Sequence, residues 1–157
     1  MGSSLILIIQ ILCLALWIGG SVVVLAFVTP EIFGQLADKS QAGRIAGAIL
    51  KKFRTLLLAA AVILGITIWI QIIALGPMMA LRLRLALILV SFSILIESYI
   101  RFFVSDRMKR LYADSAEKTA SPGENEFRNL HRRSLQGFVL NLFLGITVVI
   151  TLVLPSS

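Results

Sequence analysis

The sequence predicts an all-α integral membrane protein, a four-transmembrane-helix bundle made of two antiparallel hairpins. Of its 157 residues, 58% are hydrophobic and only 15% are charged, which is too apolar for a soluble domain of this length. Four apolar runs reach or approach the length of about 20 residues with which a helix crosses a bilayer, and the basic residues lie between these runs. We expect spans at about residues 5–28, 56–75, 83–104 and 136–154.

The apolar runs are expected to be helices, because the bilayer core offers no water to unpaired backbone groups. The length predicts one domain, residues 1–157. The first run is expected to be a retained helix rather than a secretory signal. No basic residue precedes it, and it is longer than the apolar core of a signal peptide.

The basic residues predict how the chain is threaded. Thirteen of the 15 lysines and arginines lie in residues 29–55 and 101–135, the first and third gaps between the runs. By the positive-inside rule these long loops are cytoplasmic and both termini lie outside. The expected location is the cell membrane, as a multi-pass protein of a bacterial inner membrane.

Both cytoplasmic gaps are expected to be partly helical. Ile45, Ile49 and Phe53 recur at a spacing of four residues, which is typical of an amphipathic helix, and this run leads into the second span. Residues 102–112 similarly extend the third span. On the other side, residues 76–79 contain a Gly-Pro pair and predict a short outer turn.

The composition also predicts the partners. The net charge of +7 flanks membrane spans, so anionic lipid headgroups at the cytoplasmic face are the expected partner. No nucleic-acid partner is expected, because the sequence contains no recognition fold for one. The single cysteine, Cys13, excludes an intramolecular disulfide and a cysteine-cluster metal site. Neither a metal nor another cofactor is predicted.

The expected fourth helix carries its polar and small residues on one stripe. The stripe follows a three-and-four spacing and is polar at its cytoplasmic end; its members are His131, Ser134, Phe138, Asn141, Gly145 and Val148. On the third helix Ser93, Glu97 and Arg101 share a face. Small residues that would let helices pack closely occur elsewhere in the spans, at Gly19, Gly20, Ala61 and Gly65.

Glu97 and Asn141 are expected to lie at a common depth. Glu97 precedes the end of its span by seven residues, about 10 Å of helix, and Asn141 lies a similar distance inside the fourth span. The hypothesis is a cytoplasm-facing polar pocket formed by Glu97, Arg101, His131, Ser134 and Asn141.

Two interpretations of Glu97 stay open. It is the only acid within a span, and such a residue is costly enough to suggest a functional carboxylate. Alternatively, Arg101 one turn later pairs with it in a structural clamp and extends toward the headgroups. His131, the only histidine, could titrate near neutral pH beside Glu97 or act as an interfacial anchor. Asn141 could simply hydrogen-bond between helices.

Two segments resemble a known family. Leu16–Gly20, followed by Thr29–Phe33, resembles the start of a family of small four-helix membrane proteins catalogued as a domain of unknown function. Phe127–Ser134, with Asn141 seven residues on, is similar to its C-terminal signature. That family also includes the eukaryotic transmembrane protein associated with cisplatin resistance. The resemblance implies a four-helix membrane bundle without an established activity. By this resemblance the positions to probe are Gly19, Gly20, Pro30, Phe33, His131, Ser134 and Asn141.

Two other four-helix membrane families fit less well. The copper-resistance membrane domain and the protoporphyrinogen oxidase of the haem pathway both rely on histidines within the membrane. None of the four expected spans contains a histidine.

The expected function is the binding or transport of a small polar or cationic solute at the polar pocket, or interaction with another membrane protein, without catalytic turnover. A homodimer is plausible because four helices are few for a transporter. The alternatives are a redox protein that holds haem, quinone or copper, and a structural subunit of a membrane complex.

Overall fold

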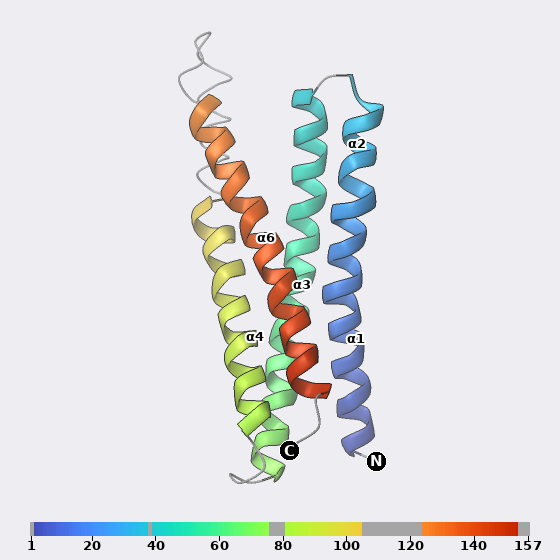
Figure 1. The fold of residues 1–157 in the computed structure, drawn as a ribbon, viewed down its shortest axis with the longest axis vertical. Coiled ribbons are helices and arrows are strands. Elements are labelled where there is room, and N and C mark those ends of the chain that lie inside the picture. The colour runs from blue at the N-terminus through green and yellow to red at the C-terminus, as the bar shows by residue number, and fades with distance from the viewer. Residues whose placement is uncertain (1, 38, 76–80, 105–123, 154–157) are drawn as a thin grey trace.

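The structure, a computed structural model, describes residues 2–37, 39–75, 81–104 and 124–153 (Figure 1). Within these ranges the chain is almost wholly helical. Four helices are long and apolar enough to cross a membrane: Ser4–Gln35, Gln41–Leu75, Leu81–Phe103 and Arg132–Val153. The expectation of an all-helical chain with four candidate spans is therefore confirmed. The expected outer turn at residues 76–79 lies outside the described residues.

The first span contains a π-helical turn. Helix α1 (Gly2–Val23) continues through η1 (Val24–Val28) into α2 (Thr29–Gln35). Pro30 has no N–H group and its ring clashes with a regular helix. A wider π turn lies just before the proline, and in it the backbone N–H and the hydroxyl of Thr29 both donate to the carbonyl of Val24, the hydroxyl at 2.8 Å.

The second span begins well before its apolar run. Helix α3 (Lys39–Leu75) has 37 residues, about 55 Å at the usual helical rise, whereas the hydrocarbon layer is about 30 Å thick. The amphipathic run with Ile45 and Ile49 is thus one continuous helix with the span. This continuity places Arg54 inside a candidate span rather than in a loop.

The third and fourth spans are α4 (Leu81–Tyr99) with its π-helical end η2 (Ile100–Val104), and α6 (Glu124–Val153). The expected extension of the third span is helical as far as Val104, and the rest of residues 102–112 lies outside the described part of the chain. Helix α6 begins before its apolar run.

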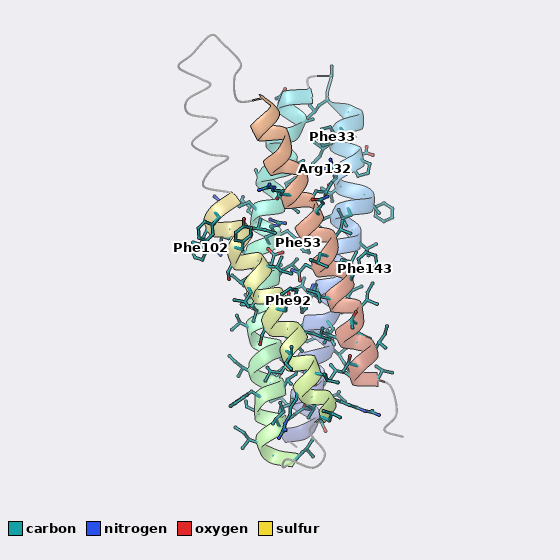
Figure 2. All side chains as sticks on the ribbon, turned by 60° about the vertical axis from the view of Figure 1, so that its left-hand side comes forward. Phe33, Phe53, Phe92, Phe102, Arg132 and Phe143 are labelled. Atoms are coloured by element: carbon teal, nitrogen blue, oxygen red, sulfur yellow. The ribbon has the colours of Figure 1, made fainter. Side chains whose placement is uncertain are left out.

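The four long helices form a four-cornered bundle. Figure 1 shows them running in alternating directions along one long axis, and α3 and α6 each pack against both α1 and α4. The side chains between them are buried, among them Trp17, Leu64, Ile68, Val90, Phe138 and Val148. Large apolar side chains such as Phe102 and Phe143 cover the outer surface (Figure 2), which is the distribution that lipid requires.

Two glycines let aromatic rings enter the bundle. A Cβ atom at Gly145 would lie 3.2–3.3 Å from the indole ring of Trp17, and one at Gly20 would lie 2.6 Å from the ring of Phe53. The indole nitrogen of Trp17 also donates to the carbonyl of Asn141 at 3.2 Å. A larger residue at Gly145 would therefore displace the ring that joins α1 to α6.

We predict that Gly145→Leu lowers the stability of the bundle by about 1–3 kcal/mol, because the added side chain overpacks the contact with Trp17. Gly19→Leu is the matched control, since Gly19 is exposed and a Cβ there would meet nothing within 4 Å. Unfolding of the detergent-solubilised protein, followed by circular dichroism, measures both variants. Equal losses in the two would contradict the packing account.

Candidate functional site

A buried polar network joins α3, α4 and α6. The side-chain amide of Asn141 donates to Glu97 Oε1 at 2.9 Å. The amide oxygen of Asn141 accepts the hydroxyl of Ser93. Arg54 Nε lies 3.8 Å from Glu97 Oε2, and Arg54 Nη2 donates to the backbone carbonyl of Ser134 at 2.6 Å. The network therefore links four charged or polar side chains from three helices, two of them from α4.

Regular helical spacing places these side chains on the inner faces. Ser93 and Glu97 are four residues apart on α4, so both point the same way and both are buried. On α6, Ser134, Phe138 and Asn141 follow the four-and-three spacing of a buried stripe. The inner faces of α4 and α6 thus meet at the level of Glu97.

Arg54 completes the inner face of α3. Its guanidinium carbon lies 5.7 Å from the centre of the Phe138 ring, which is a cation–π geometry. Phe138 in turn contacts Phe53 edge-on, with ring centres 6.2 Å apart. Arg54 and Glu97 are 9% and 3% exposed. At such burial an ion pair stabilises only if further hydrogen bonds satisfy both groups. Here the carbonyl of Ser134 accepts from one nitrogen of Arg54, and Asn141 donates to one oxygen of Glu97.

One donor in this network stays unsatisfied. Glu97 uses one oxygen for Asn141 and turns the other toward Arg54. Arg54 Nε is buried, and within the described part of the chain it has no hydrogen-bond partner. Since more than about 90% of buried polar groups are satisfied in native proteins, this donor marks a place where the network is incomplete.

The network opens onto a pocket between α3 and α4. This small, partly open hollow has a cavity volume of about 30 Å³ and is lined by Lys51, Arg54, Thr55, Leu58, Glu97 and Arg101. The four residues from α3 are spaced at i, i+3, i+4 and i+7 and so share one face. Chemically, the pocket offers three cations, one carboxylate that is already paired, one hydroxyl and one apolar wall.

The structure brings together three of the five residues of the hypothetical polar pocket and sets a fourth beside them. Glu97 and Asn141 meet directly, and Ser134 takes part through its backbone carbonyl. Arg101 lines the pocket with an exposed side chain. His131 belongs to α6, but its side chain lies outside the described part of the structure.

The ion pair recorded for Glu97 is with Arg54 and not with Arg101. Arg101 follows Glu97 by four residues, but it lies in the π-helical end of α4 and faces solvent. Arg54 reaches Glu97 from the neighbouring helix. Sequence reasoning missed Arg54 because its charge placed it in a loop. The buried spacing of Leu57, Ala61 and Leu64, continued one step toward the N-terminus, would have indicated it.

The family and packing positions are spread over the bundle. Gly19 and Pro30 are exposed, Phe33 is half-buried and Ala61 is buried. A Cβ at Gly65 would make an ordinary contact with Val90. None of these positions lines the pocket.

A metal centre has no obvious place among the described side chains. No group of three or more histidine, cysteine, aspartate or glutamate side chains there could hold a metal ion. Cys13 is buried and unpaired as a thiol.

Comparison with known proteins gives a family and no relative of known activity. A family model with the description "Domain of unknown function (DUF4149)" matches residues 12–117, which include Arg54, Glu97 and the whole pocket lining. No curated protein and no solved structure matches the chain. Because the match spans more than half of the sequence, the chain belongs to the DUF4149 family.

Proposed function

We propose that this protein is a multi-pass protein of a bacterial inner membrane that binds a small polar solute in the pocket between α3 and α4. The observation that carries the proposal is the position of the Arg54–Glu97 pair, which lies within candidate spans and opens onto that pocket. Charged side chains within spans are costly, and those that occur usually line a cavity or a solute path.

The proposed orientation places the pocket at the cytoplasmic side. The basic residues on which the positive-inside rule rests lie in residues 29–55 and 101–135, and the pocket lining comes from the adjoining parts of α3 and η2. On this proposal both termini lie outside and a solute enters from the cytoplasm.

The open pocket favours a binding role over a structural clamp. A clamp requires Glu97 and its partner to be close and satisfied. It does not require an open hollow beside them, or a buried guanidinium nitrogen that makes no hydrogen bond within the described residues. On this proposal, the resemblance to the family that includes the membrane protein associated with cisplatin resistance fits a solute-handling role.

We predict that a cysteine in the pocket is reached by water from the cytoplasmic side. In a Cys13→Ala background, Leu58→Cys places the thiol in the pocket lining, whereas Leu56→Cys places it on the exposed, lipid-facing side of α3 at nearly the same depth. Thiol reagents react with the thiolate, so only the hydrated position should be modified. A small membrane-impermeant maleimide is added to inverted and to right-side-out vesicles.

The expected result is rapid labelling of Leu58→Cys in inverted vesicles and little labelling of Leu56→Cys in either preparation. Equal labelling of the two positions would mean that the pocket is not a water-filled feature. Faster labelling of Leu58→Cys in right-side-out vesicles would reverse the proposed orientation.

We further predict that the protein, purified gently from its native membrane, is colourless and free of stoichiometric metal. The proposed site works through charge and hydrogen bonding and needs no prosthetic group. An ultraviolet-visible spectrum and elemental analysis measure this. A haem Soret band or one bound metal ion per chain would replace the solute-binding proposal with the redox alternative.

A further inference from the structure

We infer that the pocket between α3 and α4 recognises a phosphate-bearing anion. This inference rests on the proposed function, because it assumes that the pocket is a binding site, and it assigns the chemical class of the ligand. The cationic solute considered from the sequence fits the pocket less well than an anion does. The reason is the arrangement of charge around the hollow.

Cations from two helices converge on the pocket. Lys51 and Arg54 lie three residues apart on α3, so both fall on the face that lines the hollow, and Arg101 reaches it from η2 at the end of α4. Helices α3 and α4 pack along one another. The three cations therefore surround one space rather than being spread over a surface.

The one acid in the lining does not balance these cations. Glu97 is occupied by Arg54 and by the amide of Asn141. Among the described residues, no ion pair is recorded for Lys51 or Arg101. Three cations against one carboxylate leave a surplus of two positive charges in the lining. At the edge of a low-dielectric bundle such a surplus attracts anions and repels cations more strongly than it would in water.

The hydrogen bonding of Arg54 also favours a ligand that supplies a hydrogen-bond acceptor. Arg54 is 9% exposed and lines the pocket, and its buried Nε, which lies 3.8 Å from Glu97 Oε2, makes no hydrogen bond within the described part of the chain. A cationic ligand brings no acceptor to this guanidinium, whereas each oxygen of an anion can accept a hydrogen bond. The missing hydrogen bond at Nε thus agrees with the charge surplus in favouring an anion over a cation.

The donor set suits a phosphate group in particular. An arginine presents several donors to phosphate oxygens, and lysine adds a compact charge. The hydroxyl of Thr55 lies in the same lining and donates to the carbonyl of Lys51 at 3.2 Å. Leu58 supplies an apolar wall for the organic part of the ligand. A phospholipid headgroup and a soluble phosphate compound share this chemistry.

The test measures thermal stabilisation of the full chain, since a ligand that binds only the folded state raises Tm. The protein is placed in phosphatidylcholine nanodiscs and titrated with inorganic phosphate, with chloride at the same ionic strength as reference. A second arm uses nanodiscs doped with phosphatidic acid and no added phosphate. A third arm titrates choline chloride as a cationic probe.

Three charge-neutralising variants make the test specific. Lys51→Gln and Arg101→Gln each remove one cation from the lining. Lys52→Gln removes the same charge from the neighbouring exposed residue, which does not line the pocket. We expect stabilisation by phosphate, by phosphatidic acid or by both, with the half-maximal concentration raised about tenfold in each lining variant and almost unchanged in Lys52→Gln.

The outcomes distinguish a soluble phosphate ligand from a lipid headgroup, and they test the anion inference separately from the proposed binding site. A response to inorganic phosphate alone indicates a soluble phosphate compound, and a response to phosphatidic acid alone indicates a lipid headgroup. Stabilisation by choline or no response in any arm would overturn the inference. So would a Lys52→Gln variant whose half-maximal concentration rises as much as that of the lining variants. The labelling of Leu58→Cys does not depend on the ligand. A hydrated pocket without a phosphate response therefore refutes the anion and leaves the proposed binding site standing.

Discussion

The buried Arg54–Glu97 pair is the interaction on which the rest of the bundle depends. Both groups are almost fully buried, so most of their hydrogen bonds must come from neighbouring helices. Asn141 and the carbonyl of Ser134 provide those contacts from α6, and Phe138 covers the guanidinium. The rotation of three helices about their own axes is thereby constrained at one level, and the pocket opens at that same level.

Hydropathy was enough to predict the four spans, and helical spacing was enough to bring Glu97 and Asn141 to a common depth. Neither could identify the partner of Glu97. Arg101 was the natural candidate because it lies one turn away on the same helix. Packing between helices, together with the π-helical end of α4, selects Arg54 over Arg101. The spacing of the buried residues of α3 indicates that Arg54 lies on the inner face, but it does not show that Arg54 pairs with Glu97. Membrane sidedness, predicted from charge, stays a prediction.

The same residues explain why a pocket exists beside the network. Helix α3 runs without interruption from its amphipathic part into its apolar part, so the face that carries Arg54 and Leu57 inside the bundle also carries Lys51 at its edge. Deeper in the bundle, Arg54 and Glu97 neutralise each other, and α6 hydrogen-bonds to both of them. Farther out, Lys51 and Arg101 have no recorded counter-ion among the described residues. Along α3 the basic side chains thus change from ion-paired inside the bundle, at Arg54, to without a counter-ion among the described residues at the opening of the pocket, at Lys51.

The central claim is that Arg54 and Glu97 stabilise the bundle as a pair. A double-mutant cycle tests it most directly, with Arg54→Met, Glu97→Gln and the combined variant unfolded by sodium dodecyl sulfate in mixed micelles. Each single change should cost about 3–5 kcal/mol, because it leaves one buried charge unpaired. The combined variant should cost clearly less than the sum, with a coupling of about 1–3 kcal/mol. Additive losses would contradict the account.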